Sequence, residues 1–152
     1  MESTRHSRCT ERRDPPLEWL DFDDDEAERP FLEWLLSLPE VDRDLTIGRI
    51  IALRQLAASG EIVDGDTRHI KPIRRDPEMW ELRWSEAGAL IRQYHAEPSE
   101  LPRCLVRLHV HLKEIARTEP ETTHLQDIEI SWAMLRYRAG ESSLWGYGER
   151  SE

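Results

Sequence analysis

Alternating apolar and polar residues run through the middle of the chain, between Arg68 and Lys113. A period of two is typical of strands that bury one face. The pattern predicts four strands, at about residues 68–74, 79–85, 90–96 and 104–113. The connections between them are short, which favours antiparallel neighbours.

Apolar residues at helical spacing predict helices on both sides of this strand region. A short helix is expected to begin at Pro30 and to end at Pro39, since proline is tolerated in a first turn but not in a helix interior. A second helix is predicted over about residues 40–59, and a last one over about 123–138. Because a tight corner joins the first two helices, they are expected to form a helical hairpin.

Together these elements predict an α+β fold with an N-terminal helical hairpin, a four-stranded antiparallel sheet and a C-terminal helix. The helices are expected to cover the apolar face of the sheet and to leave its polar face open. Residues 1–28 are expected to form an acidic, flexible extension, residues 29–140 the folded domain and residues 141–152 a tail.

Composition changes this picture mainly through the distribution of charge. The 152 residues carry a net charge of -10, but residues 67–118 hold 10 Lys and Arg against 7 Asp and Glu. Residues 1–66 hold 8 against 17, and residues 119–152 hold 3 against 7. The positive excess therefore coincides with the predicted sheet, which points to a localised anion site.

Other features exclude several classes of protein. No apolar run approaches the roughly 20 residues of a membrane span, and the polar N-terminus lacks a signal core. Cys9 and Cys104 make no disulfide framework and are expected to be free thiols of a cytoplasmic protein.

The last predicted strand carries the clearest candidate chemistry. Arg107, His109, His111 and Lys113 alternate with apolar residues, so they are expected to lie on one face of the sheet. Such a row of cations and imidazoles is suited to binding successive phosphates and to moving a proton. The alternative is an ordinary solvated face of an antiparallel sheet.

Cations on the other strands extend this row. Lys71 and Arg74 lie on the first strand, Arg83 on the second and Arg92 on the third. A half-buried arginine is costly unless it binds an anion, which favours a ligand at Arg92. The alternative for Arg92 is an ion pair with a carboxylate such as Glu81.

A metal site on these strands is also conceivable. His109 and His111 are two residues apart, and His69 and His95 lie on other strands. No Cys, Asp or Glu completes an obvious set of ligands, so neither a metal nor another cofactor is expected.

An ordered set of short motifs, over about residues 30–138, resembles the HigB-type toxins of the RelE superfamily. The motifs are Phe31-Leu32-Glu33-Trp34-Leu35, Leu38-Pro39, Ile70-Lys71-Pro72-Ile73, Trp80-Glu81-Leu82-Arg83, Ile91-Arg92, Leu108-His109-x-His111-x-Lys113 and Asp127-Ile128-Glu129-Ile130 followed by Arg136. The resemblance implies a RelE-like fold and a metal-independent endoribonuclease that cuts mRNA on the ribosome and so inhibits translation. It also implies a type II toxin–antitoxin module, with a helix-turn-helix, HigA-like antitoxin as partner, and a phage-borne module is among the expectations.

The resemblance also implies roles for individual residues. Such enzymes cleave RNA by attack of a 2′-hydroxyl on the adjacent phosphate, and Arg83 and Arg92 would clamp that phosphate. His109 or Lys113 would serve as acid or base. Arg92, His109 and Lys113 are thus the expected catalytic residues. The expected RNA-binding residues are Lys71, Arg74, Arg83, Arg107 and His111.

One departure from the family keeps a second interpretation open. Glu114 follows Lys113 where the family usually has a second lysine, and acidic loops lower the positive charge further. Weaker electrostatic binding to the ribosome is expected as a result. The alternative function is a non-catalytic protein-interaction module on a RelE-like fold.

Overall fold

The computed structural model describes residues 5–63 and 69–147, and its centre is a five-stranded mixed sheet. In chain order the elements are η1 (Arg8–Thr10), β1 (Glu18–Asp21), α1 (Arg29–Ser37), α2 (Glu40–Ala58), β2 (Ile70–Pro72), β3 (Met79–Glu86), β4 (Ala89–Ala96), β5 (Cys104–Leu112), α3 (Glu119–Ala139) and η2 (Glu141–Gly146). The strand order is β1-β5-β4-β3-β2. The pair β1–β5 is parallel, and the other neighbours are antiparallel.

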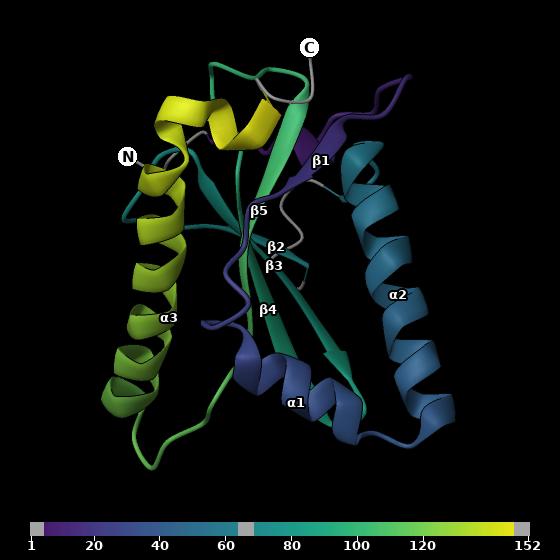
Figure 1. The fold of residues 1–152 in the computed structure, drawn as a ribbon, viewed down its shortest axis with the longest axis vertical. Helices are drawn as coiled ribbons and strands as arrows, with labels where there is room; N and C mark the ends of the chain where they lie inside the picture. Colours follow the sequence, from purple (N-terminus) through teal and green to yellow (C-terminus); the bar gives the residue numbers. More distant parts are fainter. Residues whose placement is uncertain (1–4, 64–68, 148–152) are drawn as a thin grey trace.

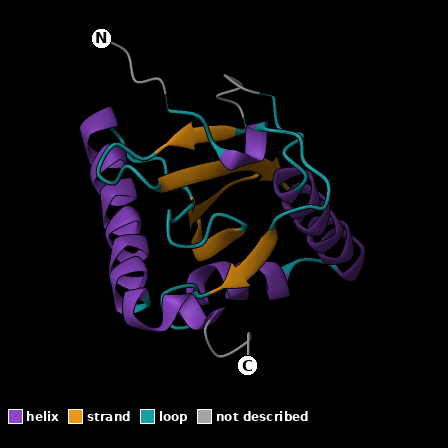
Figure 2. Cartoon of the chain, turned by 90° about the horizontal axis from the view of Figure 1, so that it is seen from above, coloured by secondary structure: helices purple, strands orange, loops and turns teal. Residues whose placement is uncertain are grey.

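Helices lie on both faces of this sheet (Figures 1 and 2). Helix α3 runs along one face, called here the α3 face, and α2 runs along the other, called the α2 face. Helix α1 crosses one end of the α2 face, where Phe31 packs against Ile91 and Val110. None of the described helices combines the length and the apolar character that a membrane crossing requires.

The expected RelE-like arrangement of a helical hairpin and a four-stranded antiparallel sheet is wrong. A strand, β1, precedes both helices and adds a fifth, parallel strand beside β5. The first two helices are therefore not N-terminal, and α1 lies across the end of the sheet rather than alongside α2 (Figure 1). The sequence did not predict β1 for two reasons. Parallel pairing between distant segments leaves no local signal, and a four-residue strand between Pro16 and an acidic run is too short to show clear alternation.

The segment expected to be a flexible extension is part of the folded body over residues 5–28. Cys9 is 0% exposed and Leu20 is 2% exposed. The Arg8 guanidinium donates hydrogen bonds to the carbonyl oxygens of Pro98, Leu101 and Cys104.

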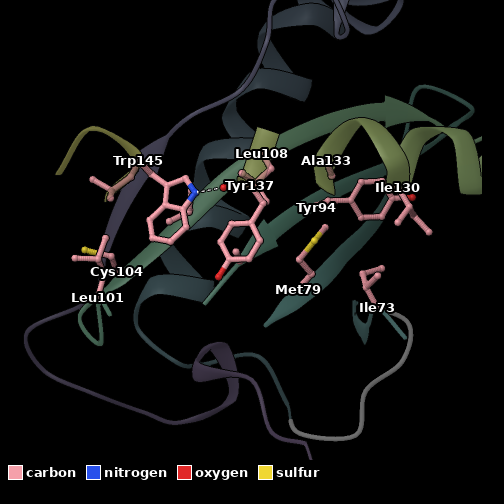
Figure 3. Packing of buried hydrophobic residues seen from close by; sticks show 13 residues of the cluster. Ile73, Met79, Tyr94, Leu101, Cys104, Leu108, Ile130, Ala133, Tyr137 and Trp145 are labelled. Atoms are coloured by element: carbon pink, nitrogen blue, oxygen red, sulfur yellow. Dashed lines mark hydrogen bonds between the residues drawn. The ribbon is translucent and has the colours of Figure 1, made fainter. Parts of the chain in front are cut away.

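The expected tail is also partly structured, because Trp145 of η2 is buried against Tyr137 of α3 (Figure 3). Residues 1–4 and 148–152 lie outside the described residues, as do Arg68 and the expected turn at 64–66.

A β-bulge divides β5 into two halves with different alternation. Tyr94 pairs with His109 and His95 pairs with Arg107, so Leu108 is the extra residue. Before the bulge, Val106 and Leu108 join the core under α3, whereas Val110 after it joins the core under α1. The bulge therefore breaks the single row of four polar residues that strict alternation predicts.

Helix α2 uses few of its apolar side chains in the core. Only Thr46, Ala57 and Ala58 are buried. The large apolar side chains that stay exposed are Val41, Leu45, Ile47, Ile51 and Leu56. The core lies mainly under α3, where Tyr94, Leu108 and Tyr137 are nearly fully buried (Figure 3).

Candidate functional site

Four cationic side chains gather around one buried carboxylate on the α3 face. Lys71 of β2 pairs with Glu81 of β3, and Arg83 of β3 pairs with Arg92 of β4. Lys113 follows β5 directly, and its backbone N–H donates to Leu90 at the start of β4. We call Lys71, Glu81, Arg83, Arg92 and Lys113 the basic cluster.

Glu81 is the centre of this cluster. Its Oε2 lies 3.6 Å from Nε of Arg83, and its Oε1 lies 3.6 Å from Nε of Arg92. The amide of Gln126 on α3 donates to Oε1 over 2.8 Å. Burial raises the pKa of Glu81, and the four cations oppose this shift. Four positive charges this close together favour the binding of an anion.

Arg92 is the most deeply buried cation of the cluster, with a side chain that is 6% exposed. One terminal nitrogen donates to the carbonyl oxygen of Ile91, and Nε has no hydrogen-bond partner among the residues described. Burial and the nearby Arg83 lower the pKa of Arg92. The ion pair with Glu81, which was the alternative role for Arg92, is present, with Nε 3.6 Å from Oε1 of Glu81.

Lys113 directly follows the end of β5 and is half-buried. Burial lowers its pKa, and the positive charges of Arg92 and Arg83 lower it further. A lysine with a lowered pKa gives up its proton more readily than a solvated one. A small cavity of about 70 Å³ beside it is also lined by His111, Gln126 and Glu129.

His111, rather than His109, adjoins the basic cluster, because its partner across the sheet is Arg92. Its Nε2 lies 3.0 Å from the Tyr94 hydroxyl, and its Nδ1 lies 3.1 Å from the carbonyl oxygen of Leu112. The Leu112 carbonyl oxygen accepts a hydrogen bond from Nδ1–H, so Nε2 accepts a hydrogen bond from the Tyr94 hydroxyl. Burial lowers the pKa of His111 to about 4, so its ring is neutral at neutral pH.

His109 is 0% exposed and lies between the sheet and α3. Its Nε2 is 2.5 Å from Oε2 of Glu129. Burial raises the pKa of Glu129, but the hydrogen bond from His109 and the charges of His111 and His109 together lower it overall. His109 is therefore placed to orient α3 against the sheet rather than to touch a ligand.

Two of the expected RNA-binding residues lie elsewhere. Arg74 is exposed in the turn between β2 and β3. Arg107 belongs to the α2 face because of the bulge. It forms an ion pair with Asp23 at 2.8 Å and donates a hydrogen bond to Oε1 of Glu28 over 3.1 Å. Its charge is used within the fold.

Three residues near the cluster were missed as site residues by the sequence analysis. They are Tyr94, Gln126 and Glu129. The expected open sheet face concealed the role of α3, which covers part of that face. Gln126 and Glu129 are three residues apart on α3, a spacing that puts polar side chains on one helix face and could have signalled the contact.

Among the described residues, one group of three side chains has the geometry of a metal site. It consists of Cys9, His95 and Glu97 and contains no residue of the basic cluster. Comparison with known protein families, with characterised proteins and with solved structures returns no match to this chain.

Proposed function

We propose that the basic cluster binds the phosphodiester backbone of RNA and that the protein is an endoribonuclease that cuts mRNA. One observation carries the proposal: the four cations Lys71, Arg83, Arg92 and Lys113 gather around the buried carboxylate of Glu81 on the α3 face. Planar guanidinium groups match phosphate geometry, as Arg83 and Arg92 would in this site. The motif resemblance to mRNA-cleaving toxins supports the same substrate and a role in stopping translation.

The proposed reaction needs a base, an acid and charge stabilisation. Lys113 is half-buried and has a lowered pKa, so its neutral amine takes the proton of the ribose 2′-hydroxyl as the 2′-oxygen bonds to phosphorus. The bond from phosphorus to the 5′-oxygen breaks, and the Lys113 ammonium gives that proton to the 5′-oxygen. Arg83 and Arg92 stabilise the extra negative charge on the phosphate in the transition state.

This scheme differs from the expected roles in one respect. His109 was the expected acid or base, but it is buried against Glu129. His111 instead supports the site through the Tyr94 hydroxyl. The products would carry a 2′,3′-cyclic phosphate and a 5′-hydroxyl, because the 2′-oxygen displaces the 5′-oxygen.

The test is cleavage of an mRNA on translating ribosomes, mapped by primer extension. Wild type should produce cuts, and Arg92→Gln and Lys113→Gln should each reduce the rate about 10²-fold or more, in line with loss of a group that stabilises transition-state charge or transfers a proton. Arg74→Gln is the matched control, because it removes one exposed positive charge outside the cluster. Equal losses in Arg74→Gln and Arg92→Gln would contradict the assignment, and cuts with 3′-hydroxyl ends would contradict the chemistry.

A second candidate function, protein binding without catalysis, is favoured by α2. Its exposed apolar side chains include Val41, which is 70% exposed, and Leu45, which is 52% exposed. A chain with a net charge of -10 favours a basic partner. We therefore propose that a helical segment of a basic protein, such as the expected helix-turn-helix antitoxin, covers α2.

Two variants separate the two functions in a growth assay. If the protein acts as a ribonuclease, Arg92→Gln should relieve growth arrest, and Leu45→Asp should prevent rescue by the antitoxin while leaving the arrest intact. If the protein acts only through binding, Leu45→Asp should abolish the effect and Arg92→Gln should leave it unchanged.

A further inference from the structure

Three side chains with metal-binding atoms meet where the N-terminal segment crosses the end of β4. Cys9 comes from η1, His95 from β4 and Glu97 from the chain just after β4. Cys9 and His95 are 0% exposed, and Glu97 is 8% exposed. Cys9 and His95 are 86 residues apart in the sequence, so only the fold brings them together.

The distances among these three groups suit a small metal ion. Sγ of Cys9 lies 3.8 Å from Nε2 of His95 and 3.8 Å from Oε2 of Glu97. Nε2 of His95 lies 2.8 Å from Oε2 of Glu97. A triangle with these sides has a point equidistant from all three atoms at about 2 Å, close to the usual Zn–N and Zn–O distances and slightly below Zn–S.

We propose that Cys9, His95 and Glu97 bind one Zn²⁺ ion. Thiolate, imidazole and carboxylate together form a ligand set that zinc accepts. On binding, the ion replaces the thiol proton of Cys9, which is released to solvent. The thiolate and the carboxylate then balance the two positive charges of the ion, so the buried site is neutral.

The surrounding groups hold the ligands in place. The backbone N–H of Arg8 donates to Oε1 of Glu97 over 2.8 Å, which leaves Oε2 to face the site. The hydroxyl of Ser7 lies 2.5 Å from Oε2 and accepts a hydrogen bond from the backbone N–H of Cys9. Ser7 is 1% exposed, and its hydroxyl donates a hydrogen bond to this Oε2.

The arrangement does not suit a cysteine nucleophile. Cys9 and Glu97 both approach the same nitrogen of His95, whereas a catalytic triad needs its carboxylate on the other nitrogen. The thiol is also fully buried, so no substrate reaches it. A bound ion would instead join the N-terminal segment to β4 and the chain that follows it, which is a structural role.

The test is the metal content of the purified chain after expression with added zinc and gel filtration in metal-free buffer. About one zinc ion per chain is expected for wild type. The substitutions Cys9→Ser and His95→Gln should reduce this content to near zero. Cys104→Ser is the matched control, because Cys104 is also a buried cysteine, and it should keep the ion.

A second measurement covers variants that fail to fold. Wild type is unfolded in denaturant in the presence of a chelator, and both are then removed. The chain is refolded with one equivalent of Co²⁺, whose bond to a thiolate produces a characteristic absorption band. Appearance of the band together with native fluorescence supports the site. Folded wild type without zinc and without the band would overturn the proposal, as would an unchanged zinc content in folded Cys9→Ser.

Discussion

Glu28 is a buried carboxyl whose protonation should make the stability of the fold depend on pH. It precedes α1, is 2% exposed, and accepts the backbone N–H of Val110 over 2.9 Å. The pairing of β1 with β5 ends at Arg107, so the N–H of Val110 has no strand partner on that side. The Glu28 carboxyl accepts this hydrogen bond instead. Arg107 and Asp23 complete the group.

The two carboxyl groups beside Arg107, those of Glu28 and Asp23, have pKa values shifted in opposite directions. Burial raises the pKa of Glu28 from 4.5 to about 8, and the hydrogen bond and charge of Asp23 raise it while Arg107 lowers it. Burial would also raise the pKa of Asp23, but Arg107 and the hydrogen bond from Glu28 outweigh it, so that pKa falls. At neutral pH, Asp23 is therefore the ionised partner of Arg107, and Glu28 keeps its proton.

A carboxyl with a raised pKa stabilises the fold at low pH. Below about 4.5 both the folded and the unfolded chain hold the proton, and between about 4.5 and 8 only the folded chain holds it. The free energy of unfolding then falls by about 1.4 kcal/mol for each pH unit. Integrated from pH 5 to pH 8, this single group costs about 3 to 4 kcal/mol.

The substitution Glu28→Gln removes the titration while keeping the shape and a donor toward Asp23. We expect the difference in unfolding free energy, variant minus wild type, to rise by about 3 kcal/mol between pH 5 and pH 8. Urea unfolding at four pH values, followed by tryptophan fluorescence, measures it. Glu33→Gln is the control, because it removes an exposed carboxyl from the same helix. A difference that does not change with pH would refute the reasoning and show that Glu28 is ionised in the fold.

Two further predictions concern the packing of the N-terminal and C-terminal segments. Gly140→Ala should destabilise the fold by about 1–3 kcal/mol in urea unfolding, because an added Cβ would lie 2.3 Å from Trp145. Gly48→Ala, where nothing lies within 4 Å, should be neutral or stabilise α2 by up to about 1 kcal/mol, and an equal loss at both sites would contradict the packing argument. Leu20→Ala should cost about 2–5 kcal/mol, since the side chain is 2% exposed in β1. A cost below about 0.5 kcal/mol would mean that β1 does not pair with β5 in solution.

Local patterns predicted the antiparallel part of the sheet and missed the part that depends on distant contacts. The strands predicted at 79–85, 90–96 and 104–113 agree closely with β3, β4 and β5. These strands follow one another along the chain and pair as antiparallel neighbours, β3 with β4 and β4 with β5. Strand β1 is a short segment after two prolines that pairs with the distant β5, and the hydrophobic periodicity of the sequence does not predict such a contact.

The start of the last helix was predicted four residues late. Helix α3 begins at Glu119 because the Thr118 hydroxyl caps Glu121, and because Pro120 suits a first turn. The sequence contained both signals. They were outweighed by the apolar spacing, which becomes regular only from Leu125 onwards.

The candidate site was partly accessible from sequence. Lys71, Arg83, Arg92 and Lys113 were expected to act together, and the fold brings them together around Glu81. The position of Arg107 could not be inferred, because a single extra residue at Leu108 puts Arg107 on the face opposite His109. His109 lies on the predicted face, but α3 covers it. A bulge of this kind depends on tertiary packing and leaves no mark in the alternation.

The bulge also sets how strongly the basic cluster can attract RNA. It removes Arg107 from the row of cations and pairs that charge with Asp23. Four cations then surround the Glu81 carboxylate, in a chain whose net charge is -10. Each phosphate neutralised by the protein adds a fixed increment to the salt dependence of binding, so a cluster of this size neutralises only a few phosphates. Long-range attraction is correspondingly weak, and if the cluster cleaves RNA, its selectivity must come from the placement of one phosphate against Arg92 rather than from the field of the whole molecule.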